Sequence, residues 1–229
     1  PGVIFENEQF HMLVQTEYMN LGGTIEYLVS NDGKAYERVG TALHSISGTD
    51  EAALYDPHPA IINGKKYITY SGSNFISVNE GEDASKEWAP HTGRPDIYLA
   101  KSESGSWQGP WKRVGKILAH SEVPHHNQFG HPQYEWGLEG SQLIQMPDGT
   151  ILMNVVCFLP HGEFSTRQRV FFAFADKVEG PYHTIGTVLQ PTAEGWESGE
   201  NGHAAGLLLG DELSLFYQAR APGKAPNIG

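Results

Sequence analysis

Residues 134–157 read YEWGLEGSQLIQMPDGTILMNVVC, and this stretch decides the fold. Glu139 stands between glycines, ahead of two apolar runs that are joined by a turn at Pro147-Asp148-Gly149. A Gly-containing turn between two apolar runs is typical of a β-hairpin. The stretch therefore predicts a hairpin with a carboxylate immediately ahead of it.

The same form occurs twice more. Residues 54–71, LYDPHPAIINGKKYITYS, have Asp56 as the acid and Asn63-Gly64 as the turn. Residues 200–217 read ENGHAAGLLLGDELSLFY and form the third copy. A polar or acidic group ahead of a hairpin is thus used three times.

The copies of a second repeat alternate with those of the first along the chain. Each copy is an apolar strand, a short charged turn, an aromatic residue, another strand and a closing glycine: IEYLVSNDGKAYERVG (25–40), IYLAKSESGSWQGPWKRVG (97–115) and VFFAFADKVEGPYHTIG (170–186). Repeated four-stranded units without intervening helices indicate the blades of a β-propeller.

We therefore predict an all-β fold, a β-propeller that is incomplete in this chain, with about three and a half blades in a single domain. A propeller must close its ring to hide its strand edges, and three and a half blades do not close. The predicted blades span residues 1–41, 56–118, 139–190 and, as a partial fourth, 200–229. Both ends of the chain have the character of cuts through a longer protein.

Composition excludes several classes of function. The 229 residues carry a net charge of −12, which argues against nucleic acid as a partner. No apolar run approaches the ~20 residues of a membrane-spanning helix. The single cysteine, Cys157, excludes an internal disulfide and lies in an apolar run, where we expect it to be inert.

Asp56 and Glu139 are the candidate catalytic residues. Counted back from their hairpin turns, the two occupy equivalent positions, and the first strand of each blade is expected to line the central channel. Two carboxylates at one channel mouth suit glycoside hydrolysis, in which one group donates a proton and another stays charged. The alternative is that each acid merely caps a turn ahead of its strand.

A third carboxylate is expected from the first blade. The hairpin of residues 3–13 aligns with residues 60–70, which places the slot of Asp56 at or just before position 1. Pro1 would then correspond to Pro57. We predict an Asp immediately upstream of Pro1.

These motifs resemble the five-bladed propeller glycoside hydrolases of families 43 and 32. The resemblance rests on Asp56-Pro57 ahead of NGKKYITYSG, on Glu139-Gly140, on the blade ends GSWQGPWKRVG and DKVEGPYHTIG, and on Gly202-His203. It implies that Glu139 is the general acid and that Asp56 orients the substrate and tunes the acid. The general base, or the nucleophile of a retaining relative, would be the Asp ahead of Pro1.

Further residues near the predicted channel mouth are candidates for substrate binding. Tryptophan rings can stack on sugar faces, and polar side chains can bond their hydroxyls. The alternatives are ordinary packing for the tryptophans and a solvated loop for the polar groups. The candidates are His58, Trp136, Trp196, Glu200, Asn201 and His203.

No metal site is assigned from the sequence, and no cofactor is expected to be required. His120, His125, His126 and His131 match no standard metal-binding spacing and have no cysteine among them. The resemblance implies that His203 lies near a water molecule or a structural calcium ion.

The sequence thus predicts a glycosidase for plant or algal oligosaccharides or polysaccharides, with inversion as the expected stereochemistry. The alternatives are a non-catalytic carbohydrate-binding propeller and a glycoside phosphorylase, which needs basic residues to hold phosphate. Only Arg94, Arg167, Arg169 and Arg220 were candidates for that role. A secreted or periplasmic location is favoured, a cytoplasmic one stays open, and the sugar, the linkage and the oligomeric state are undetermined.

Overall fold

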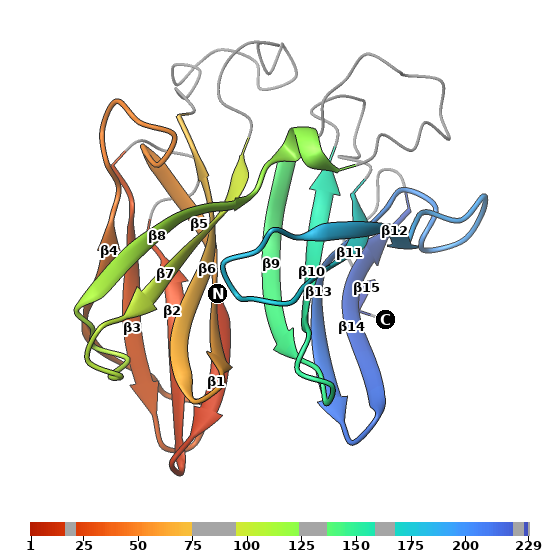
Figure 1. Ribbon diagram of the computed structural model, residues 1–229. Helices are drawn as coiled ribbons and strands as arrows, with labels where there is room; N and C mark the ends of the chain where they lie inside the picture. Colours follow the sequence, from red (N-terminus) through yellow and green to blue (C-terminus); the bar gives the residue numbers. More distant parts are fainter. Residues whose placement is uncertain (17–21, 75–94, 124–136, 159–167, 222–226, 229) are drawn as a thin grey trace.

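The computed structural model describes residues 1–16, 22–74, 95–123, 137–158, 168–221 and 227–228. Apart from a short 3-10 helix, η1 (His120–Glu122), the regular elements in these residues are all β-strands. Three four-stranded antiparallel sheets and one three-stranded sheet stand beside one another, as Figure 1 shows. This is the architecture of an incomplete β-propeller.

In each sheet the strands follow one another in chain order. The first sheet contains β1 (Gly2–Glu6), β2 (Gln9–Gln15), β3 (Thr24–Ser30) and β4 (Glu37–His44). The second contains β5 (Ala53–Ile62), β6 (Lys65–Ser73), β7 (Asp96–Ser102) and β8 (Trp111–Leu118). The third contains β9 (Gly137–Gln145), β10 (Ile151–Phe158), β11 (Arg169–Ala175) and β12 (His183–Leu189), and the fourth contains β13 (Glu200–Leu209), β14 (Glu212–Arg220) and β15 (Asn227–Ile228).

The predicted turns form the hairpins. Asn63 and Gly64 connect β5 to β6 with φ angles of 50° and 69°. Positive φ at both central residues is the geometry that lets a two-residue turn follow the right-handed twist of its strands. Asn and Gly tolerate this conformation better than other residues, so the register of the hairpin is set locally.

Three apolar clusters fill the spaces between neighbouring sheets. Leu13, Ile25 and Tyr27 of the first sheet meet Leu54 and Ile68 of the second. A larger cluster joins the second sheet to the third and includes Cys157, which is buried as predicted. A small cluster of Val156, Val170 and Ala204 joins the third sheet to the fourth. The core is therefore a series of layers between sheets, which fixes how the innermost strands face one another.

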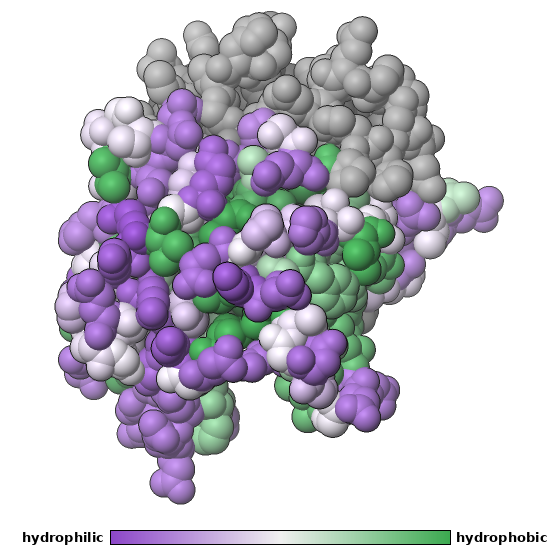
Figure 2. Space-filling view, in the orientation of Figure 1, coloured by the Kyte–Doolittle hydropathy of each residue, from purple (hydrophilic) through white to green (hydrophobic). Residues whose placement is uncertain are grey.

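The two outermost sheets leave apolar side chains exposed on their inner strands. Val3 and Phe5 of β1 are exposed, as are Leu207 and Leu209 of β13. Figure 2 shows apolar surface gathered along the middle of one face of the molecule, with polar surface toward its edges. No helix in the described residues is long and apolar enough to cross a lipid bilayer.

Two strands begin earlier than the sequence predicts. The apolar pattern placed the strands of these hairpins at residues 60–62 and 206–209, but β5 starts at Ala53 and β13 at Glu200. A β-bulge interrupts each strand, between Tyr55 and His58 in β5 and between Gly202 and Ala205 in β13. The bulge breaks the alternation of apolar and polar residues, so the first part of each strand resembles a loop in sequence.

Candidate active site

The innermost strands of the second, third and fourth sheets each carry a bulge near their start. In each bulge one residue adopts a left-handed backbone conformation: Asp56 with φ 48°, Gly140 with φ 59° and His203 with φ 46°. This conformation is costly for residues other than glycine and is frequent at functional sites. Counted from the bulges, Asp56 corresponds to Gly140 rather than to Glu139, which precedes the bulge in β9. The equivalence inferred by counting from the turns is therefore wrong by one residue.

The bulges bring three predicted site residues together. Asp56 and Glu139 each place a carboxylate oxygen, and His203 a ring nitrogen, so that these three atoms lie within 4.8 Å of one another. Nε2 of His203 is 3.7 Å from Oε1 of Glu139. Side chains from three separate sheets thus converge on one point, although they are far apart in the chain.

Glu139 is the most deeply buried acid of this cluster. It is 6% exposed, and its Oε1 accepts a hydrogen bond of 2.7 Å from Nε2 of Gln168. Burial raises the pKa of Glu139 well above its ordinary value, and the nearby carboxylates of Asp56 and Glu200 raise it further. Glu139 is therefore suited to remain protonated where an ordinary glutamate is charged.

Asp56 is held by a neighbour from the first sheet. Its backbone N–H donates a 2.6 Å hydrogen bond to Oε1 of Gln15, at the end of β2. Its Oδ2 is fully covered and has no hydrogen-bond partner among the described residues. Burial raises the pKa of Asp56, and the proximity of His203 opposes part of that rise.

The spacing of the two acids limits their roles. In inverting glycosidases the acid and the base stand about 6.5–9.5 Å apart, which leaves room for a water molecule. Oxygens of Asp56 and Glu139 approach within 4.8 Å, so they are too close for that arrangement. The geometry instead suits a carboxylate that raises the pKa of a neighbouring acid.

The other predicted binding residues are distributed around this cluster. Glu200 is buried and forms an ion pair with Arg220, with 2.8 Å between Oε1 and Nε. Asn201 is buried and donates from Nδ2 to the carbonyl of Gln190. Both side chains are therefore engaged within the fourth sheet and the segment leading to it, rather than solvated.

His58 and Trp196 have different surroundings. Burial lowers the pKa of His58 to about 4, so this ring is neutral at neutral pH. Trp196 is 42% exposed and stacks on Tyr217, with 6.0 Å between ring centroids. Among the described residues, neither side chain forms a hydrogen bond or an ion pair with Glu139. Trp136 lies outside the described residues.

Two contributors to the site were missed by sequence reasoning, namely Gln15 and Gln168. Both are polar residues at strand ends, which is the same kind of signal that singled out Asp56 and Glu139. Neither lies ahead of the first hairpin of a sheet, where the repeat places its polar groups, so the repeat did not draw attention to them.

The cluster does not make a calcium site by itself. Calcium takes six to eight oxygen ligands. Asp56 and Glu139 offer carboxylate oxygens and His203 a nitrogen, and Oε1 of Glu139 already accepts the hydrogen bond from Gln168. These three described residues therefore supply only part of the ligand set that calcium takes.

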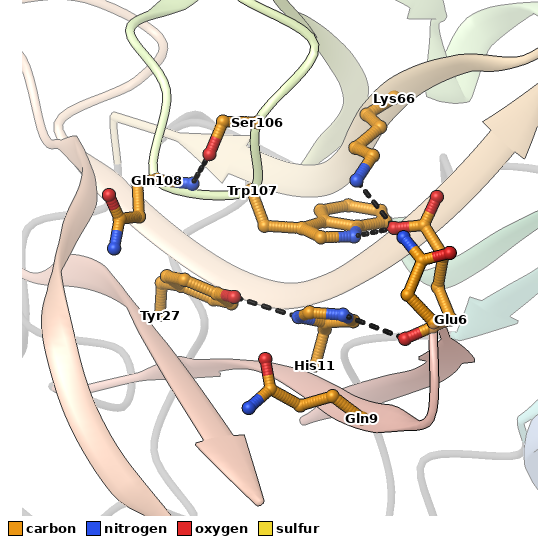
Figure 3. Close-up of a pocket in the computed structure, with 9 residues that line it drawn as sticks. Glu6, Gln9, His11, Tyr27, Lys66, Ser106, Trp107 and Gln108 are labelled. Carbon is orange, nitrogen blue, oxygen red and sulfur yellow. Dashed lines mark hydrogen bonds and ion pairs between the residues drawn. The ribbon is translucent and has the colours of Figure 1, made fainter.

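A separate cavity of about 330 Å³ lies at the other end of β1, beside the β1–β2 turn. Figure 3 shows that its polar groups bond one another: Lys66 and Trp107 donate to Oε2 of Glu6, and His11 bonds the hydroxyl of Tyr27. Hydrogen bonds from Lys66 and Trp107 outweigh the effect of burial and lower the pKa of Glu6. The groups that line this cavity form a polar contact between the first and second sheets. The charge of Glu6 is balanced there by Lys66.

Comparison with known proteins supports the fold. No family model matches the chain, and no curated protein matches it in sequence. Solved structures are similar to it, including Zg3597, a family 117 glycoside hydrolase from the marine bacterium Zobellia galactanivorans (TM-score 0.63, 14% identity). An α-L-arabinofuranosidase from Lactobacillus brevis (TM-score 0.65, 13% identity) and a family 32 β-fructofuranosidase from Bombyx mori (TM-score 0.65, 12% identity) are also similar.

These matches cover 98% or more of the chain but only 64%, 65% and 41% of the three neighbours, in the order named. At such identities the likeness shows the fold alone. The chain has the propeller fold of these glycoside hydrolases, as the sequence motifs predicted.

Proposed function

We propose that the chain is a glycoside hydrolase that cleaves O-glycosidic bonds in plant or algal oligosaccharides or polysaccharides with inversion at the anomeric carbon. Glu139 is the general acid in this proposal, and Asp56 orients and tunes it. The observation that carries the proposal is the burial of Glu139 beside two other carboxylates, which raises its pKa.

A general acid must hold its proton at the working pH and release it in the transition state. An exposed glutamate is deprotonated at neutral pH. Removing the carboxyl group from water and placing Asp56 and Glu200 nearby both disfavour the charged form of Glu139. The cluster therefore supplies what protonation of a leaving-group oxygen requires.

The base of the reaction is proposed to be the Asp expected ahead of Pro1. Gly2 packs closely on β5, since a Cβ atom at Gly2 would lie 2.7 Å from both Cα of His58 and the carbonyl oxygen of Pro57. The start of β1 is therefore beside the bulge that carries Asp56. A residue ahead of Pro1 would come from the correct side of the site.

The structurally similar enzymes suggest which substrates to test first. An α-L-arabinofuranosidase and a β-fructofuranosidase share this fold, so arabinofuranosides and fructofuranosides are the first classes. Trp196, His58, Glu200, Asn201 and His203 stay candidates for binding the sugar.

The decisive experiment compares the wild-type protein with Glu139→Gln on a panel of 4-nitrophenyl and alkyl glycosides and on sucrose. The Gln side chain keeps the size of Glu139 but has no acidic proton to transfer to the leaving group. We expect hydrolysis by the wild type and a loss of activity in the variant, largest for alkyl leaving groups. Sugar binding without hydrolysis by either protein would favour the carbohydrate-binding propeller.

The phosphorylase alternative gains no support from the described arginines. Arg169 is 1% exposed, and Arg220 is paired with Glu200. Arg94 and Arg167 lie outside the described residues. The calcium ion that the resemblance implies near His203 also stays a prediction.

A further inference from the structure

Gln168 is the residue that touches the proposed acid most closely. Its Nε2 donates a 2.7 Å hydrogen bond to Oε1 of Glu139, and Gln168 itself is 6% exposed. Gln168 immediately precedes β11, whereas Glu139 belongs to β9, so the contact crosses the third sheet above β10. The buried amide therefore has a defined position relative to the carboxyl group.

The fourth sheet holds Gln168 in this position. The backbone N–H of Asn201 donates a 2.9 Å hydrogen bond to the carbonyl oxygen of Gln168. A Cβ atom at the next residue, Gly202, would lie 1.8 Å from Oε1 and 2.8 Å from Cδ of Gln168. Only glycine at position 202 leaves space for the amide where it now lies.

The hydrogen bond distinguishes the two oxygens of Glu139. Oε1 accepts the N–H of Gln168 and faces the ring of His203 at 3.7 Å. Oε2 has no hydrogen bond within the described part of the chain. A proton on Oε1 would compete with the amide hydrogen for the same side of the group, so the proton is better placed on Oε2.

We propose that Gln168, kept in place by Gly202, is a positioning residue that directs the acidic proton of Glu139 to Oε2. This inference rests on the function proposed above. In the reaction the O–H bond at Oε2 breaks and the proton passes to the glycosidic oxygen, which also takes the electron pair of the breaking C–O bond. Water attacks the anomeric carbon and gives its proton to the base, and proton exchange with solvent then returns a proton to Oε2 and removes one from the base.

The test uses Gln168→Met and Gly202→Ala. Gln168→Met removes the N–H donor with little change of side-chain volume. Gly202→Ala keeps the amide of Gln168 but displaces it. Gln142→Met is the matched control, because Gln142 also bridges two sheets by bonding the backbone of Gly206 but does not touch Glu139. All variants are purified in the same way as the wild type, and their folding is checked by circular dichroism.

The first readout does not depend on activity. The carboxyl groups are labelled with ¹³C at Cδ of glutamate, and the Glu139 signal is assigned by its loss in Glu139→Gln. The amide N–H favours the charged carboxylate, so its removal is expected to raise the pKa of Glu139 by roughly one unit in Gln168→Met. The same direction is expected in Gly202→Ala and no shift in Gln142→Met.

The second readout is the dependence of kcat on the leaving group. Loss of proton direction is expected to lower kcat by about tenfold to a hundredfold for alkyl glycosides and much less for 4-nitrophenyl glycosides, with KM nearly unchanged. Gly202→Ala and Gln168→Met act through one contact, so the double variant is expected to be no worse than the poorer single variant.

An unchanged Glu139 titration in Gln168→Met and Gly202→Ala would overturn the inference, as would an equal shift in Gln142→Met. If the wild type hydrolyses none of the glycosides, the proposed function fails, while the titration still decides whether Gln168 controls the carboxyl group.

Discussion

Glu139 and Glu6 are both largely removed from water, yet their pKa values move in opposite directions. The side chain of Glu139 is 8% exposed and that of Glu6 is 22% exposed. Glu6 accepts hydrogen bonds from Lys66 and Trp107, whereas Glu139 faces the carboxylates of Asp56 and Glu200. Burial raises the pKa of both groups, and the neighbouring groups decide whether the net shift of each pKa is downward or upward.

The comparison separates an acid that is paired with a cation from the acid of the candidate site. Glu6 joins the first sheet to the second, because its partners come from β6 and from the loop between β7 and β8. Glu139 has a single amide donor and an oxygen left without a partner among the described residues. A neighbouring cation stabilises the charged form of a carboxyl group and lowers its pKa. Neighbouring carboxylates destabilise that form and raise the pKa.

The largest effect is expected when each glutamate is exchanged for glutamine. Glu139→Gln should lower kcat for an alkyl glycoside by about 10²–10⁴-fold, because general acid catalysis contributes that much. Glu6→Gln should retain activity but lower the free energy of unfolding by about 1–3 kcal/mol, because the charged partner of Lys66 is lost. Kinetic assays and urea titrations of both variants check this. Loss of activity in Glu6→Gln with unchanged stability would contradict the division of roles.

A smaller effect is expected from Asp56→Asn, which removes one like charge from beside Glu139. The pKa of Glu139 should then fall, so the basic limb of the kcat/KM profile should move to lower pH. Activity would be reduced at neutral pH and partly regained in acid. Complete inactivity at every pH, with rescue by azide, would instead identify Asp56 as a nucleophile.

Stability should depend on pH with opposite signs for the two glutamates. The pKa of Glu139 is raised on folding, so its contribution is most favourable below the unfolded value of about 4.3 and is lost as pH rises through the folded value. The pKa of Glu6 is lowered, so its contribution is present above that value and is lost as pH falls. Urea denaturation from about pH 2 to about pH 8 should therefore show the stability difference between wild type and each glutamine variant changing in opposite directions, with the change for Glu6→Gln at the acid end of the range and that for Glu139→Gln above it. Parallel changes would contradict the two pKa directions.

The smallest effect is expected from removing divalent ions. The proposed function needs no metal ion for its chemistry, so treatment with EDTA should leave both kcat and the thermal midpoint unchanged. A loss of either that is restored by calcium would show that an ion completes the site after all.

The hairpins could be predicted because their signals are local. Asn63-Gly64 and Pro147-Asp148-Gly149 mark turns, and the apolar runs around them are long enough to mark strands. The starts of β5 and β13 could not be predicted, since their bulges disturb the alternation on which the interpretation depends. The same bulges caused the error of one residue in relating Asp56 to Glu139.

The sequence by itself determined the repeated hairpins, the all-β fold and the candidates Asp56, Glu139 and His203, because turn chemistry and apolar patterning act over a few residues. Only the tertiary structure decided which acid has its pKa lowered by a cation and which has its pKa raised by burial and by neighbouring carboxylates. That outcome depends on Lys66 reaching Glu6 and on Gln168 and Asp56 reaching Glu139. These contacts join distant segments of the chain, and the free energy of a buried charge depends on whatever the folded chain places beside it.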